Sequence, residues 1–358
     1  MMNFLSRLIR RDGATVPSMD GVLRPNSRLD EAPVLAAAAE PDNLAALGDD
    51  LVFSSANALY RLTRATSGEP QQIHAFETPV TALASGSDGA LAVGLSGNGV
   101  RIVGGAHDGL RMDRFGSSPA FGPTALSFHG PHTLFVAIGS AHNEAGEWQR
   151  DLMERRSSGS VWKVDLTSGA AAAIATGLAF PNGLLVHDGG LVVSESWNHR
   201  LLRFDLRKAN ARPQIVADDL PGYPGRLSAS ADGGAWLAVF APRSQLIEFV
   251  LRERGYCGRM LAELPKEYWI APSLRSGLSF REPMQGGAVR VHGIYKPWAP
   301  TRSYGLAVRL GPDLQPLQSF HSRADGNRHG IVSLCEWSGA AVFASRGDGV
   351  IGAIAPDA

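Results

Sequence analysis

The chain has 358 residues, 44% of them hydrophobic, and its 34 basic residues balance its 34 acidic ones. This length suits two domains or one large all-β domain, and it is long enough to bury a core without disulfide staples. Zero net charge excludes the broad basic surface that nucleic-acid binding needs, so we expect no nucleic-acid partner. The only two cysteines, Cys257 and Cys335, lie far apart in sequence, and we expect them to be reduced packing residues.

The first segment of the chain, residues 1–18, is interpreted as a tail ahead of one folded domain, residues 19–358. Residues 1–11 (MMNFLSRLIRR) contain an apolar stretch that is too short for a signal peptide, and basic residues follow it. A frayed helical stub is one interpretation, and a weak contact with a membrane surface is the alternative. No window approaches the roughly 18 uncharged apolar residues that cross a bilayer, so we predict a soluble, cytoplasmic protein.

Six segments share one pattern, in which a short apolar strand, a Gly, Asp or Asn turn and a second apolar strand follow one another. The segments begin at Asp42, Thr81, Thr124, Asn182, Gly225 and Gly330. Turns such as Asp88 and Gly89 supply the positive φ that tight hairpins need. Leucines at equivalent positions recur roughly every 40 residues, which is the period of a four-stranded propeller blade. The sequence therefore predicts an all-β fold, a six-bladed β-propeller of four-stranded antiparallel blades.

Two stretches exceed the period of a blade and are predicted to be lid-like insertions, at about 140–157 and about 241–302. Both contain aromatic and cationic residues that could box a substrate, and long insertions in compact domains are often functional. The second interrupts blade five, and residues 245–254 and 255–264 within it are expected to form two short helices, although the first also suits a strand. Packing of the insertion on the outside of the blades is the alternative to a lid.

The sixth blade supplies only three strands before the chain ends. An N-terminal strand around residues 28–37 is predicted to complete this blade, which closes the ring and leaves no free sheet edge there.

The first strand of each blade lines the central channel of a propeller, so the residues at its start surround one mouth. Taken blade by blade, they are Asp42 with Asn43, Thr81, Thr124, Asn182, Gly225 with Arg226, and His329. This set is more polar than packing alone requires, and we interpret it as a candidate site. The alternative is that the Asn and Asp residues cap strand starts through bonds to the backbone.

Several longer motifs occur in an order typical of one family. They are MDGVLRPNSRLDEA (19–32), GEWQRDLMERRSSGSVWKVD (146–165), FPNGLLV (180–186), LPGYPGRLSASADGGAW (220–236) and HGIVSLCEWSGAAVFAS (329–345). On these motifs the chain resembles the strictosidine synthase-like and adipocyte plasma-membrane-associated protein-like family of six-bladed propellers. It resembles the gluconolactonases and paraoxonases more distantly.

The resemblance to the lactonases implies a divalent cation, usually Ca²⁺, held over the channel by a Glu, two Asn and an Asp. In this sequence Asp42 stands at the Glu position and Asn182 at the second Asn position. Thr124 and Gly225 stand at the other two, so half of the shell is lost or weakened. We therefore expect at most a weak Ca²⁺ site at Asp42 and Asn182.

The resemblance to plant strictosidine synthases implies an acid-base Glu two residues after a His in the sixth blade. The matching His is His329, but Ile331 occupies the Glu position, which disfavours the bond-forming reaction. Glu336 is interpreted as a turn residue at the far end of the strand.

The mouth of the channel is predicted to hydrolyse an ester or lactone of a small, partly apolar molecule. His329 is the predicted general base, because its ordinary pKa lies near neutrality, and Asp42 is predicted to orient a water or an ion. Residues predicted to bind the substrate, by polarising its carbonyl or enclosing it, are Asn182, Arg226, Thr124, Trp148 and Tyr295. The alternatives are that His329 is a structural donor, and that the propeller binds a ligand or partner without catalysis.

Overall fold

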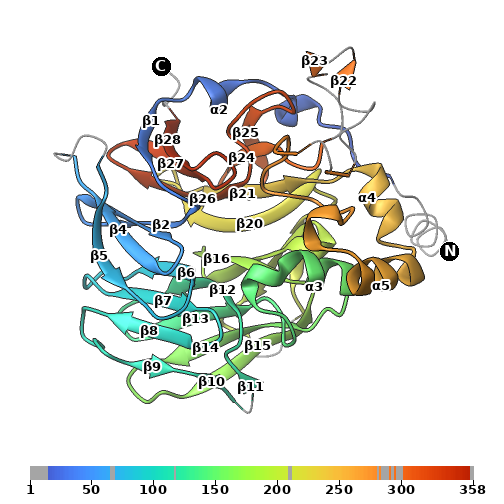
Figure 1. The fold of residues 1–358 in the computed structure, drawn as a ribbon. Coiled ribbons are helices and arrows are strands. Elements are labelled where there is room, and N and C mark those ends of the chain that lie inside the picture. The colour runs from blue at the N-terminus through green and yellow to red at the C-terminus, as the bar shows by residue number, and fades with distance from the viewer. Residues whose placement is uncertain are drawn as a thin grey trace.

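The computed structural model describes residues 15–64, 69–116, 118–208, 212–279, 282–283, 290–291, 294–295 and 301–354. Their strands form six four-stranded antiparallel sheets arranged as the blades of a propeller (Figure 1). The predicted six-bladed β-propeller is therefore confirmed. The proposed membrane contact at 1–11 lies outside the described residues. Within the described part of the chain, no helix is long and apolar enough to cross a membrane.

Each of the first four blades is built from strands consecutive in sequence. Blade one contains β2 (Pro41–Leu47), β3 (Asp50–Ser55), β4 (Ala58–Leu62) and β5 (Gln71–Ala75). Blade two contains β6 (Val80–Ser85), β7 (Leu91–Leu95), β8 (Gly99–Val103) and β9 (Arg111–Met112). Blade three contains β12 (Pro123–Phe128), β13 (Thr133–Ile138), β14 (Gly159–Asp165) and β15 (Ala171–Leu178). Blade four contains β16 (Pro181–His187), β17 (Gly190–Glu195), β18 (Arg200–Asp205) and β19 (Gln214–Ala217).

The burial of each strand follows its position in the blade. Strands β7 and β17 are second from the channel, and every residue in them is buried, because neighbouring blades cover both faces of the sheet. Strand β5, the outermost strand of blade one, is exposed along its whole length. The continuous apolar runs in the sequence therefore mark the inner strands.

In the last two blades, the four strands do not all follow one another directly in sequence. Blade five contains β20 (Gly222–Ala229), β21 (Ala235–Pro242), β24 (Gly305–Leu310) and β25 (Pro316–Ser322). Blade six contains β26 (Ile331–Trp337), β27 (Ala340–Ser345), β28 (Val350–Ile354) and the N-terminal strand β1 (Val34–Ala37). The predicted closure is confirmed, but β1 is shorter than the predicted 28–37. Residues Arg28–Glu31 form helix α2, which buries Leu29 against Phe320 and Phe343.

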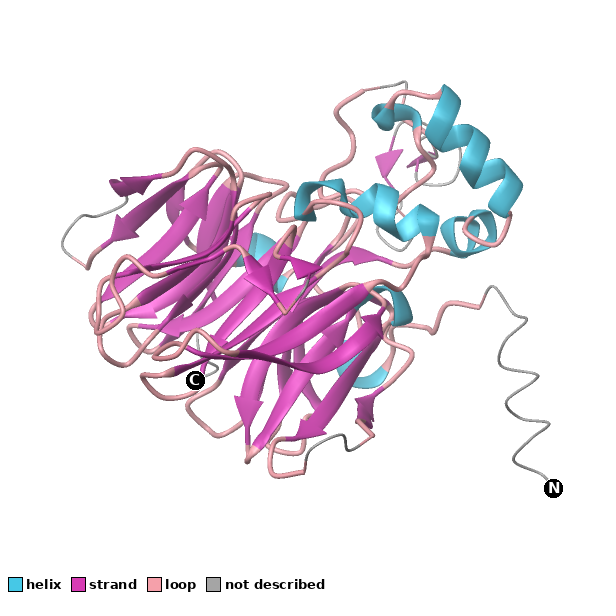
Figure 2. Cartoon of the chain, turned by 90° about the horizontal axis from the view of Figure 1, so that it is seen from below, coloured by secondary structure: helices cyan, strands magenta, loops and turns pink. Residues whose placement is uncertain are grey.

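The remaining elements lie in the insertions and connections. The first insertion contains η2 (Ala145–Glu147) and α3 (Trp148–Glu154). The second contains α4 (Gln245–Val250), α5 (Arg254–Glu263), η4 (Lys266–Tyr268), β22 (Arg290–Val291) and β23 (Ile294–Tyr295). Short elements elsewhere are η1 (Gly21–Leu23), η3 (Ser196–Asn198), β10 (Arg114–Phe115) and β11 (Ser118–Pro119). Figure 2 shows α3, α4 and α5 gathered on one side of the propeller, and the two helices predicted in the second insertion are present.

The insertions share their core with the blades. One cluster of buried residues contains Trp197 and Tyr223 from the blade-four and blade-five region together with Met153 of α3, Ile247 of α4 and Cys257 of α5. This shared packing fixes the helices against the propeller. Both cysteines are free and buried, as predicted.

Candidate functional site at the channel mouth

The innermost strand of every blade shifts its pairing register near its first residues, once in five of the blades and twice in blade five. Such a bulge leaves a residue outside the regular ladder and can re-aim its side chain. In the six blades, the residues at or beside these bulges include Asp42, Thr81, Thr124, Asn182, Arg226 and Val332. All six line one cavity of about 310 Å³ at the mouth of the channel. The repeated bulge therefore builds the floor of the candidate site.

The two insertions supply part of the remaining cavity wall. Glu144 and Trp148 come from the first insertion and Leu274 from the second. Phe180 and Phe240 add further apolar surface. The cavity therefore joins a polar floor to a largely apolar cover.

The two insertions also contact each other. The side-chain amide of Gln149 donates a hydrogen bond to the carbonyl of Pro272 at 2.6 Å, and the guanidinium of Arg150 lies over the ring of Trp269 at 5.5 Å. These contacts join α3 to the segment that carries Leu274.

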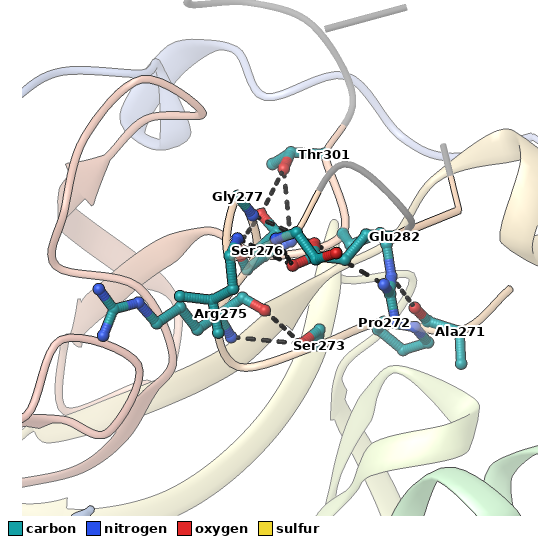
Figure 3. Close-up of polar contacts among 12 residues, drawn as sticks. Ala271, Pro272, Ser273, Arg275, Ser276, Gly277, Glu282 and Thr301 are labelled. Carbon is teal, nitrogen blue, oxygen red and sulfur yellow. Dashed lines mark hydrogen bonds and ion pairs between the residues drawn. The ribbon is translucent and has the colours of Figure 1, made fainter. Parts of the chain in front are cut away.

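Polar contacts hold the segment around Leu274 in place (Figure 3). The amide of Gly277 donates to Glu282 at 3.1 Å, and the Ser276 hydroxyl contacts those of Thr301 at 3.3 Å and Ser303 at 2.6 Å. The cover of the cavity is thus fixed by specific bonds.

Asp42 is neutralised by two arginines. Its Oδ1 accepts from Nη1 of Arg226 at 2.8 Å, and its Oδ2 lies 3.4 Å from Nη1 of Arg346. Arg346 also pairs with Glu40 at 2.9 Å. Because both oxygens already face guanidinium groups, Asp42 carries little uncompensated negative charge.

The implied Ca²⁺ does not fit the donors that are present. Thr124 donates its hydroxyl proton to the carbonyl of Pro181 at 2.6 Å, and Gly225 offers no side chain. Both carboxylate oxygens of Asp42 face arginines. A divalent ion needs several oxygen ligands, and the described residues contain no group of three His, Cys, Asp or Glu that could hold a metal. Of the predicted ligands, only Asn182 has a side chain without a hydrogen-bond partner among the described residues.

His329 is not among the residues that line the cavity. Its Nδ1 lies 2.8 Å from the Ser303 hydroxyl, and its Nε2 donates to the carbonyl of Arg323 at 2.7 Å. Burial lowers the pKa of His329, which favours the neutral imidazole.

The residue of blade six that lies at the channel mouth is instead Val332. The structural equivalent of the repeated leucine in blade six is Leu334, which is buried opposite Phe343.

Of the other residues considered from the sequence, some line the cavity and others lie elsewhere. Thr124, Asn182, Arg226 and Trp148 line the cavity with Asp42, whereas the side chain of Tyr295 lies outside the described residues. Ile331 is fully buried in the core. Glu336 accepts hydrogen bonds from the Ser230 hydroxyl at 2.7 Å and the Trp236 indole at 2.9 Å, so it joins blades six and five. Glu336 lies at the end of β26 beside the turn, as predicted, and it also links two blades.

Sequence reasoning missed Glu144. This carboxylate lines the cavity and accepts a hydrogen bond from the Ser96 hydroxyl, and no cation pairs with it among the described residues. Glu144 lies outside the blade repeat, so periodicity could not identify it. Its position within a predicted lid was the only available signal.

The fold and cavity define a class, a six-bladed propeller with a covered channel mouth. The chain resembles strictosidine synthase-like protein 2 of Arabidopsis thaliana, with 27% identity over 170 residues, which are 45% of this chain and 39% of the relative. It also resembles the bovine (Bos taurus) adipocyte plasma membrane-associated protein, with 25% identity over 281 residues, 69% of this chain and 66% of the relative. The matches thus span less than two thirds of each relative. No protein-family model matches the chain.

Solved propellers share the fold at low identity. A gluconolactonase from Xanthomonas campestris superimposes with a TM-score of 0.58 and 10% identity, covering 90% of this chain and 87% of its own. A calcium-binding regucalcin from Agrobacterium tumefaciens gives a TM-score of 0.55 and 12% identity, covering 90% and 92%. At such identity these likenesses establish the fold alone.

Proposed function

We propose that this protein hydrolyses an ester or lactone of a small, partly apolar molecule in the channel-mouth cavity. The observation that carries the proposal is the composition of the cavity wall. The carboxylate of Glu144, which pairs with no cation among the described residues, lines the same space as the amide of Asn182 and the guanidinium of Arg226. A base and hydrogen-bond donors around one cavity are what acyl transfer to water requires. The lactonase named among the structural neighbours supports this reaction class.

The proposed roles follow from the contacts of each side chain. Glu144 takes a proton from a water molecule as that water attacks the acyl carbon, and Ser96 orients the carboxylate. The Asn182 amide and a remaining N–H group of Arg226 stabilise the negative charge that develops on the carbonyl oxygen. The bond between the acyl carbon and the alkoxy oxygen then breaks, and Glu144 returns its proton to the leaving oxygen. Asp42 holds the guanidinium of Arg226 in place.

The apolar part of the cavity sets the expected class of substrate. Trp148, Phe180, Phe240 and Leu274 surround the polar floor. Trp148 packs edge-on against Phe240, with 5.3 Å between ring centres. A volume of about 310 Å³ suits a lactone or aryl ester with a short apolar substituent.

The test measures turnover of a panel of five- and six-membered lactones and aryl esters. Changing Glu144→Gln keeps the shape of the side chain and removes its basicity, and we expect kcat/KM to fall by about 100-fold or more. Asn182→Ala should lower kcat by roughly 100-fold through loss of one oxyanion donor. Glu263→Gln on the exposed part of α5 is the matched control and should leave turnover unchanged.

A binding function without catalysis is the second candidate, because Asp42 and Arg226 already neutralise each other. Absence of turnover across the panel, together with ligand binding that Trp148→Ala abolishes, would replace the hydrolase proposal with this one. Turnover that persists in Glu144→Gln would show that another group is the base.

A further inference from the structure

Arg226 reaches oxygen atoms on three other blades. Its Nη1 donates to Asp42 Oδ1 of blade one at 2.8 Å and to the Val332 carbonyl of blade six at 3.1 Å. Its Nη2 donates to the Thr81 carbonyl of blade two at 2.7 Å. Because Arg226 itself belongs to β20 of blade five, its guanidinium connects four of the six blades around the channel.

The surroundings of this guanidinium are those of a bound cation. One carboxylate oxygen and two carbonyl oxygens converge on it from separate strands, which is the kind of oxygen shell that hard cations take in proteins. The side chain is only 16% exposed, so its positive charge is largely removed from water. Burial lowers the pKa of Arg226 and Asp42 opposes this effect, while an arginine stays charged at neutral pH.

The neighbouring residues explain why a side-chain cation can fit here. Gly225 precedes Arg226 at the bulge of β20, and a Cβ at Gly225 would lie 3.3 Å from both the Ala238 carbonyl and the Phe240 ring. The position at which the lactonases carry a metal ligand is therefore occupied in this chain by Gly225, which has no side chain. The next residue extends its guanidinium toward Asp42 instead.

We propose that Arg226 is the resident cation of this channel, a covalently attached group that takes the place of a divalent ion and ties the inner strands together. The proposal concerns cation binding and stability, so it stands or falls independently of the hydrolase proposal. It implies that the intact protein gains no stability from Ca²⁺. It also implies that removing the guanidinium opens a space beside Asp42 that a small cation can occupy.

The experiment compares thermal unfolding of the wild type and Arg226→Ala with and without added cations. We expect Ca²⁺ at about 10 mM to leave the wild-type Tm unchanged. Arg226→Ala leaves Asp42 partly unpaired in a buried position, so its Tm should be lower by roughly 10 °C. Guanidinium ion at low millimolar concentration should restore part of this loss, and Ca²⁺ should restore some of it, whereas Na⁺ at matched ionic strength should not.

Arg243→Ala is the matched control. Arg243 is also buried and also lies near a carboxylate, Glu248 at 3.5 Å, but it does not line the cavity. Its loss should lower the Tm without rescue by guanidinium.

Three results would overturn the proposal. The first is a Ca²⁺-dependent rise in wild-type Tm that Asp42→Asn removes, since an ion would then occupy the channel beside Arg226. The second is an Arg226→Ala variant as stable as the wild type. The third is an equal response of the two Ala variants to guanidinium. If Arg226→Ala does not fold, Arg226→Lys serves instead, because an ammonium cannot donate to three oxygens in the same geometry and should leave an intermediate Tm.

Discussion

Two groups of buried charged residues in this propeller are similar in composition and differ in surroundings. The channel cluster contains Asp42, Arg226 and Arg346 and lies in the wall of the cavity. The α4 cluster contains His199, Tyr223, Arg243 and Glu248 and lies where helix α4 packs on blades four and five. Each has an arginine from the blade-five region beside a carboxylate.

The α4 cluster is a set of mutual contacts. Glu248 Oε1 accepts from the Tyr223 hydroxyl at 3.3 Å and lies 3.4 Å from His199 Nε2 and 3.5 Å from Arg243 Nε. None of these four residues lines the channel cavity. Burial raises the pKa of Tyr223 well above its ordinary value.

The comparison shows that perturbed pKa values and buried ion pairs alone do not identify a functional site. Both clusters have them, because burial lowers the pKa of Arg226 and the partners of Glu248 lower its pKa in spite of burial. The channel cluster differs because free space adjoins it, together with the Asn182 amide and the Thr81 hydroxyl, which have no hydrogen-bond partner in the part of the chain that the structure describes. We therefore propose that the α4 cluster serves stability and that the channel mouth contacts a ligand.

The largest expected effect that separates the clusters is that of Glu248→Ala. This change removes the carboxylate that lies beside His199, Tyr223 and Arg243, although Arg243 keeps its ion pair with Asp219, so we expect the free energy of unfolding to fall by about 3 kcal/mol. Urea unfolding measures the change, and turnover at the channel mouth should persist in the folded fraction. Glu253→Ala, on an exposed neighbouring residue, is the control and should stay within about 0.5 kcal/mol. A loss below about 1 kcal/mol for Glu248→Ala would contradict the assigned role.

The second largest expected effect is a loss of the stability that the α4 cluster contributes as the pH falls. Burial tends to raise the pKa of Glu248, but the hydrogen bond from His199 and the charge of Arg243 outweigh it and hold this pKa below its ordinary 4.5. The unfolded chain therefore binds this proton more readily, and stability present at neutral pH is lost as the pH falls below about 4.5. Burial also lowers the pKa of His199 from 6.5, which acts in the same direction from pH 6.5 downward.

Urea midpoints of the wild type and Glu248→Gln at pH 7 and pH 4 test this dependence. The difference between the two proteins should shrink at pH 4 as the native carboxylate loses its advantage. A difference of equal size at both pH values would show that Glu248 has an ordinary pKa in the folded protein.

The sequence predicted the blades well because their determinants are local. Short apolar runs and turns such as Asp88 and Gly89 specify a meander within one repeat, and the tertiary structure only stacks these units. The closing strand was predictable because the C-terminal repeat supplies only three of the four strands of blade six. The helical turn at Arg28–Glu31 was not predictable, because it depends on contacts with Phe320 far along the chain.

The site was predicted less completely because it depends on bulges and on distant segments. Five of the six ring positions followed from the repeat, and the sixth did not because the bulge in β26 falls at Val332 and not at His329. Glu144 comes from an insertion and Arg346 from the loop after β27, and nothing in the repeat places either beside Asp42. Tertiary contact alone brings these groups together.

The smallest expected effect tests one feature of the channel mouth, a buried hydroxyl without a protein partner among the described residues. Thr81 Oγ1 has no hydrogen-bond partner among the described residues, so Thr81→Val should leave stability unchanged or raise it by up to about 1 kcal/mol. Ser54→Ala is the matched comparison, because the Ser54 hydroxyl accepts from Asn43 at 2.8 Å and donates to the Asp42 carbonyl at 3.2 Å. That change should cost about 1 kcal/mol.

If the Thr81 hydroxyl is reserved for a ligand, Thr81→Val should weaken ligand binding or raise KM several-fold while the protein stays as stable as before. Urea unfolding and KM on the same preparations separate the two effects. Equal losses of stability in Thr81→Val and Ser54→Ala would mean that the Thr81 hydroxyl serves the fold, and the contrast between the two clusters would then rest on the cavity and Asn182 alone.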